Sequence, residues 1–79
     1  MTQGMFQRPN GAIVVDNDIM LASQVIWDGL REKRSYTNVV AEVMNVYNIS
    51  DDSATRLYKI IRNLYVNVER DTAHLEKGG

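Results

Sequence analysis

The stretch GAIVVDND, residues 11–18, joins the two kinds of structure that this sequence predicts. Its β-branched residues 13–15 are typical of a strand, and almost everything after them is typical of helix. A strand is not stable alone, so its pairing decides the fold. The turn-forming Pro-Asn-Gly triplet at residues 9–11 precedes it. It predicts a short β-hairpin or small sheet in which residues 5–8 form a weak first strand.

The first predicted helix follows over residues 19–30. Asp16, Asn17 or Asp18 can cap it, because a short side-chain oxygen accepts hydrogen bonds from the N–H groups of the first turn. Apolar residues surround almost the whole helix, so it is either enclosed on several sides or meets a partner. The charged connection over residues 29–34 begins at a glycine that could end the helix.

Two further helices are predicted, and together with the hairpin they give an α+β, mostly helical domain. Ser35 caps the second helix, whose many valines require support from tertiary packing. Ser50 or Asp51 caps the third, which is the best-defined element. The predicted domain covers residues 1–70, and a flexible tail follows over residues 71–79.

Composition narrows the possible functions. The chain has 79 residues and a net charge of −1, so it holds one small core and does not find nucleic acid or anionic membrane through bulk charge. It has no cysteine and one histidine, which excludes thiolate metal sites and a histidine ligand cluster. No secretory signal or membrane span is evident, and a cytoplasmic location is expected.

The predicted strand has an unprotected edge. Neither lysine, proline nor a bulge blocks residues 12–15, although proteins usually protect such an edge. An extended peptide could add itself there as the next strand, held by main-chain hydrogen bonds and selected by side-chain pockets. The third helix would supply the pocket, because its two tyrosines, Tyr58 and Tyr65, combine broad apolar faces with a polar tip. The simpler interpretation is that these residues pack the core.

Three segments resemble the PqqD-like family of recognition domains. They are VVDNDIMLASQVIWDG (residues 14–29), SYTNVVAEVMNVYNIS (residues 35–50) and DDSATRLYKIIRNLYVNV (residues 51–68). The resemblance covers most of the chain and depends on spacing and apolar pattern. The part before residue 14 is shorter than the family's usual three-strand region.

The resemblance implies a non-catalytic, winged helix-turn-helix-like domain. Such domains bind the leader of a ribosomally made precursor peptide as an added strand, between the last strand and the third helix, and present it to a modifying enzyme such as a leader peptidase or a radical-SAM protein. In this chain the resemblance implies a receiving edge, groove-lining residues and a basic rim for acidic leader residues. The receiving edge would be Ala12, Ile13, Val14, Val15 and Asp16. The groove would be lined by Leu57, Tyr58, Ile61 and Tyr65. The basic rim would be Arg56, Lys59 and Arg62.

An enzyme is not expected. Catalysis needs an acid, base or nucleophile oriented by its neighbours, and the lone His74 stands in the predicted tail beside scattered carboxylates. Helix capping explains the carboxylate pairs at residues 16–18 and 51–52 better than catalysis does. No catalytic residue, metal ligand or cofactor is therefore predicted.

A winged helix-turn-helix transcriptional regulator that binds DNA is the rival hypothesis. Arg56, Lys59, Arg62 and Asn63 could approach phosphates and bases from one helix, with a basic cluster of Arg31, Lys33 and Arg34 nearby. The chain carries slightly more acidic than basic residues, so it would gain little free energy from releasing the counterions of DNA phosphates. This hypothesis therefore ranks second.

A third possibility is a dimerising or enzyme-docking surface on the first helix. Met20 and Trp27 are core residues by default, but they could form a patch for a modifying enzyme or a second copy of the chain.

Overall fold

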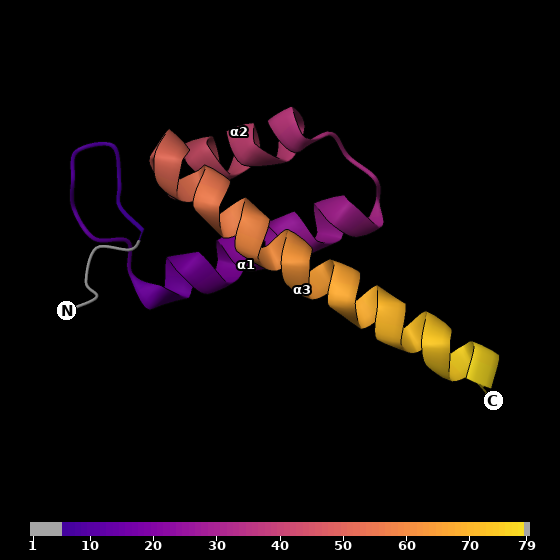
Figure 1. The fold of residues 1–79 in the computed structure, drawn as a ribbon. Coiled ribbons are helices and arrows are strands. Elements are labelled where there is room, and N and C mark those ends of the chain that lie inside the picture. Colours follow the sequence, from indigo (N-terminus) through magenta and orange to yellow (C-terminus); the bar gives the residue numbers. More distant parts are fainter. Residues whose placement is uncertain (1–5, 79) are drawn as a thin grey trace.

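Three helices make up the fold: α1 (Asp16–Arg31), α2 (Tyr36–Tyr47) and α3 (Asp51–Gly78). The computed structural model describes the backbone of residues 6–78 and the side chains of residues 6–70. In Figure 1, α3 crosses α1, α2 lies beside the start of α3, and the later turns of α3 extend beyond the other two helices. The helix includes residues 71–78, within the segment for which the sequence predicts a flexible tail.

The predicted β-hairpin or small sheet is wrong, because no strand occurs within residues 6–78. The chain does reverse at residues 9–11, where Gly11 has a φ of 91°, but the pairing is limited to one antiparallel bridge between Gln7 and Ile13. The fold is therefore all-helical rather than α+β, and it has no β wing. Met5, the first residue of the predicted hairpin, lies outside the described residues.

Helix α1 prevents the strand from growing. The C=O of Val15 accepts hydrogen bonds from the N–H groups of Asp18 and Ile19, so Val15 begins the helix instead of continuing a strand. The helix starts three residues earlier than predicted, and Val15 is its N-cap, without a side-chain capping bond. The three predicted capping residues, 16–18, lie inside the first turn, where Asp16 and Asp18 still face the positive end of the helix dipole.

Gly29 does not end α1, which continues to Arg31. It is buried where α1 approaches α2, and a Cβ at this position would lie 2.6 Å from Cγ2 of Val39. The glycine therefore allows close helix packing.

Both of the later helices begin with a serine cap, as the sequence predicts. The Ser35 hydroxyl accepts from the N–H of Asn38 at 3.1 Å, and the Ser50 hydroxyl accepts from the N–H of Ser53 at 3.2 Å. Between them, Asn48 adopts a left-handed conformation with φ of 54° and ends α2. Helices α2 and α3 thus form a helix-turn-helix with a three-residue connection.

One core joins the three helices and the N-terminal loop. Val14 is only 2% exposed and brings the loop into this core. Its fully or nearly fully buried apolar members are Val14, Ala22, Ile26, Val39, Val40, Val43, Ile49, Ala54, Leu57, Tyr58 and Ile61.

Candidate functional site

Residues 6–8, which we call the N-terminal strap, lie between residues 12–14 and the start of α3. On one side, the N–H of Val14 donates to the C=O of Phe6 at 3.0 Å, and the N–H of Arg8 donates to the C=O of Ala12 at 2.7 Å. The strap therefore occupies the inner edge of the segment that the sequence predicted as a receiving strand.

The other side of the strap is bound by the first turn of α3. The N–H of Gln7 donates to the hydroxyl of Ser53 at 2.7 Å, and the N–H of Ser50 donates to the C=O of Gln7 at 2.8 Å. Ser53 is 1% exposed, so its hydroxyl depends on such partners. The main chain of an extended segment is thus recognised from both sides at this position, which we call the strap site.

Two side chains anchor the strap. The Phe6 ring packs against the core, and the Arg56 guanidinium lies over it, 5.5 Å from the ring centroid. The Arg8 guanidinium donates to Asp18 at 2.8 Å and to the C=O of Tyr47 at 2.8 Å. Arg8 thereby supplies a cation at the negative C-terminal end of α2.

The outer edge of residues 12–15 is short. Ile13 and Val15 are each 54% exposed, and within residues 6–70 neither N–H makes a hydrogen bond. The N–H of Ala12 turns inward to the side chain of Asn10 at 3.0 Å, and the C=O of Val15 is bonded inside α1. Among the described residues, therefore, only about two positions on this side have a backbone edge without a hydrogen-bond partner.

The residues predicted to line a groove lie mainly in the core. Leu57, Tyr58 and Ile61 are 3%, 7% and 8% exposed. The Tyr58 ring packs edge-to-face against Tyr36 of α2 with centroids 4.9 Å apart. These side chains can form only the floor of a site.

Tyr65 faces α1 rather than the strap site. Its ring lies edge-to-face on Trp27, with centroids 5.1 Å apart, and its hydroxyl donates to Glu69 at 2.9 Å. That hydrogen bond, together with desolvation and the negative charge of Glu69, raises the pKa of Tyr65 above 10.0, and Arg31 partly opposes this. Trp27 is half-buried in this contact, whereas Met20, the other predicted partner-binding residue, is 54% exposed.

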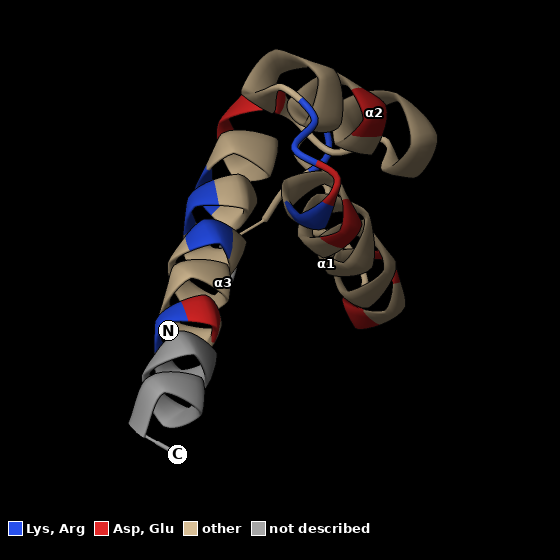
Figure 2. Cartoon of the chain, turned by 90° about the vertical axis from the view of Figure 1, so that its right-hand side faces the viewer, with Lys and Arg blue, Asp and Glu red and all other residues tan. Residues whose placement is uncertain are grey.

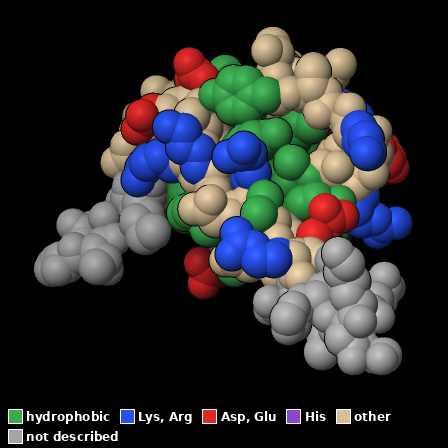
Figure 3. Space-filling view, turned by 45° about the vertical axis from the view of Figure 1, so that its right-hand side comes forward, with side chains coloured by type: hydrophobic (Ala, Val, Ile, Leu, Met, Phe, Trp, Pro, Cys, Tyr) green, Lys and Arg blue, Asp and Glu red, His purple; other side chains and the backbone are tan. Residues whose placement is uncertain are grey.

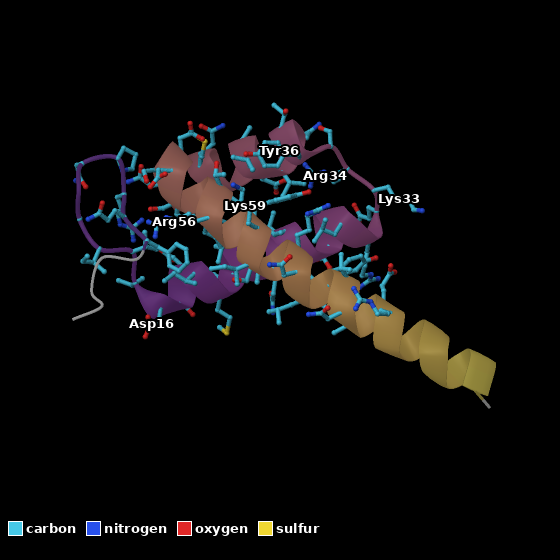
Figure 4. The ribbon with its side chains drawn as sticks, in the orientation of Figure 1. Asp16, Lys33, Arg34, Tyr36, Arg56 and Lys59 are labelled. Carbon is cyan, nitrogen blue, oxygen red and sulfur yellow. The ribbon has the colours of Figure 1, made fainter. Side chains whose placement is uncertain are left out.

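Basic residues recur along α3, as the blue segments of its ribbon show (Figure 2). Arg56 lies beside the N-terminal loop, with Asp16 below it at the start of α1, whereas Lys59 lies further along α3, toward the middle of the domain (Figure 4). Arg56 also contacts Asp52 at 3.6 Å, whereas Lys59 and Arg62 are exposed. Lys33 lies in the α1–α2 connection, at the far end of the domain from the loop (Figure 4).

Arg34 is already paired. Its guanidinium contacts Glu42 at 2.8 Å within the same part of the fold. Arg34 therefore adds no unpaired cation to the exposed basic residues of α3.

The strap site uses residues that the sequence interpretation did not select. The sequence predicts Phe6, Gln7 and Arg8 only as part of a weak strand and gives Ser53 no role. Ser53 carried a usable signal, because a serine at position 53 shares the helix face of Leu57 and Ile61, where apolar residues are expected. Nothing local indicated that Arg8 would reach the end of α2, since 39 residues separate the two partners.

Exposed apolar side chains form a second feature of the surface. On one face they make a continuous area with basic side chains around and within it (Figure 3). Ile60, Leu64 and Val68 are 43%, 51% and 48% exposed, and their four-residue spacing places them along one side of α3. A separate open hollow of about 250 Å³ is lined by Tyr36, Thr37, Val40, Ala41, Met44 and Asp51.

The described residues contain no group of three or more His, Cys, Asp or Glu side chains placed to hold a metal ion. Among the same residues, no helix has the length and hydropathy needed to cross a bilayer. Comparison of the chain with family models, with curated proteins and with solved structures found no match.

Proposed function

We propose that this chain is a non-catalytic recognition domain that binds an extended leader segment of a ribosomally made precursor peptide and presents it to a modifying enzyme. The segment binds in the strap site, between residues 12–14 and the first turn of α3. Its occupancy there requires the strap to move aside.

One observation carries this proposal: the strap site already holds an extended segment by its main chain. Four backbone groups of the strap are bonded, two to residues 12 and 14 and two to Ser50 and Ser53. Recognition of this kind depends little on side chains and suits an extended peptide. It requires no β-sheet in the receiving domain, only donors and acceptors at the spacing of an extended chain.

The surroundings of the strap site favour a peptide that also carries apolar residues, and acidic residues further along it could reach cations of α3. Ile13, Val15 and Ile60 are exposed apolar side chains on the two elements that border the strap site. Lys59 and Arg62 are exposed cations on α3, one turn after Thr55 and Tyr58, which contact Tyr36 of α2, so they lie on the α2 side of the helix and outside the strap site. A leader would meet them only where it continues past the strap site. Each exposed ion pair with an acidic leader residue would contribute about 0.2–1 kcal/mol, so the main chain and the apolar contacts would dominate the affinity.

DNA binding is the second candidate, and the helix-turn-helix formed by α2 and α3 favours it. A recognition helix usually meets DNA with its N-terminal residues. Here that end of α3 carries Asp51 and Asp52, which phosphates would repel. The net charge of −1 adds no general attraction to the duplex.

Fluorescence anisotropy with labelled leader peptides from precursors encoded beside this chain's gene tests the proposal. A leader should bind saturably with a dissociation constant at or below the micromolar range, about −8 kcal/mol or stronger. Amide NMR signals of Val14 and Ser53 should shift on binding, whereas that of Lys33, at the far end of the domain, should not.

Leaders methylated at single backbone nitrogens provide the matched control. Methylation at either of the two positions that replace Gln7 and Arg8 should weaken binding, because in the strap the N–H of Gln7 donates to Ser53 and the N–H of Arg8 donates to the C=O of Ala12. Methylation at positions outside the strap site should leave binding unchanged. Equal binding by all methylated leaders, or binding of a labelled DNA duplex while every neighbouring leader fails, would reject the proposal.

A further inference from the structure

We infer that the N-terminal strap is an internal competitor for its own binding site, and that the peptide that displaces it carries an aromatic residue followed, two positions later, by a basic one. This inference rests on the proposed function and concerns the regulation and selectivity of the same site.

The backbone pairing of the strap is short enough for another extended segment to replace it. Its pairing with residues 12–14 amounts to one bridge, and it leads into an exposed turn at residues 9–11. Gly11 has a φ of 91° and no atom within 4 Å of where its Cβ would lie, so this turn has room to change conformation. Gln7 is exposed and contributes only its main chain.

Departure of the strap without a substitute would be costly. Ser53 would lose the shorter of the two hydrogen bonds that its buried hydroxyl accepts and would keep only the one from Arg56 at 3.4 Å, and Val14, 2% exposed, would lose part of its cover. A second extended segment in the same place restores both contacts. The strap is therefore displaced by a peptide of matching pattern more easily than it opens alone.

The side-chain anchors define that pattern. Phe6 lies under the Arg56 guanidinium, a position that suits an aromatic ring. Arg8 meets the carboxylate of Asp18 and the C=O groups of Tyr47 and Asn48, which together select a cation with several donors. A leader with the arrangement aromatic–any–arginine would reproduce all of these contacts.

Competition by the strap lowers the apparent affinity for any such peptide. If the strap occupies its site about nine-tenths of the time, a competing peptide binds about tenfold more weakly than it would to an open site. Substitutions confined to the strap should therefore tighten binding, although they remove native contacts.

The test uses the full chain and a fluorescein-labelled synthetic peptide with the sequence GMFQRPNG, which copies residues 4–11. Phe6→Ala and Gln7→Pro weaken the strap without changing the receiving residues, and each should bind this peptide at least about fivefold more tightly than the unaltered chain. Gln24→Ala, at an exposed position of α1, should bind like the unaltered chain. Peptides with Ala in place of Phe or Arg should bind more weakly.

Equal affinity of the unaltered chain and both strap variants, or no binding of the GMFQRPNG peptide to any of them, overturns the inference. Measuring the affinity of a precursor leader for the unaltered chain and the strap variants distinguishes failure of this inference from failure of the proposed function. A leader that binds the unaltered chain and the strap variants equally supports the function and rejects the competitor. A copy peptide that binds while every leader fails rejects the function and supports the strap as a self-ligand.

Hydrogen exchange in the unaltered chain gives a result that does not depend on the folding of variants. The amides of Gln7 and Val14 should exchange through a local opening, at least about tenfold faster than the amides of Ile26 and Val43 in the helical core. Exchange of all four at one common rate would show that the strap leaves only on global unfolding, and would overturn the inference.

Discussion

The guanidinium of Arg8 lies 2.8 Å from the carboxylate of Asp18, and the same side chain donates to the C=O of Tyr47 at 2.8 Å. One residue of the N-terminal segment thus joins the beginning of α1 to the end of α2. Both partners of the ion pair are largely buried, with 20% and 28% of their side chains exposed. Their attraction is therefore less screened than that of a surface pair.

Arg8→Ala should lower the free energy of unfolding by about 1–3 kcal/mol, because it leaves a partly buried carboxylate and a helix-terminal C=O without their donor. Urea denaturation followed by circular dichroism measures this. Arg31→Ala is the matched control: its pair with Asp28 has side chains 64% and 61% exposed, and should be worth less than about 1 kcal/mol. Equal effects of the two substitutions would contradict the assigned role of Arg8.

Gly29→Ala should destabilise the domain by about 1–3 kcal/mol, although alanine favours helix, because the new Cβ would overlap the Val39 side chain. Combining it with Val39→Ala should recover part of the loss. A double-mutant cycle in urea measures the coupling. A stabilising effect of Gly29→Ala would show that α1 and α2 do not pack this closely.

Substitution of a serine that caps a helix should destabilise the domain more than substitution of a residue that only resembles a cap in the sequence. Ser35→Ala should cost about 1 kcal/mol, since it removes the acceptor for the N–H of Asn38. Asn17→Ala should change the stability by no more than about 0.5 kcal/mol, because Asn17 is exposed and lies inside the first turn of α1. Thermal unfolding curves compare the two, and a larger loss for Asn17→Ala would restore it as a cap.

Tyr65 should ionise at higher pH in the intact chain than in Glu69→Ala, because its hydrogen bond to the Glu69 carboxylate raises its pKa above 10.0. Since the pKa in the folded state is the raised one, the stabilising contribution is complete below about pH 10 and is lost as the pH rises through the raised value. Absorbance titration at alkaline pH measures the shift, with Tyr65→Phe identifying its signal. Unchanged titration in Glu69→Ala would contradict the contact.

Much of the helical pattern was predictable because it depends on neighbours in sequence. The residues at 35 and 50 are small hydroxylic side chains directly before apolar-periodic segments, and both act as caps. The break between the second and third helices followed from the same local signals. The buried positions of α3 were also recognisable from helical spacing, although Tyr58 and Ile61 turned out to be core rather than an open groove.

The candidate site was less predictable, because its parts are far apart in the chain. The Pro-Asn-Gly turn indicated a reversal, but whether a hairpin grows depends on what else binds its backbone. Ser50 and Ser53 take the main chain of Gln7, and α1 takes the C=O of Val15, so only one bridge forms. The strand propensity of a short segment does not show which distant residues will bind its backbone groups instead of a neighbouring strand.

By itself, the sequence determined three helices, their serine caps and the turn before residue 12, because capping, helical periodicity and turn chemistry act over a few residues. Only the tertiary structure decided that a β-branched run would become a single bridge, that Gly29 would lie within a helix contact, and that Arg8 would join two helix ends. Those outcomes follow from contacts between distant segments, whose hydrogen-bonding groups and volumes must be satisfied together in one small core.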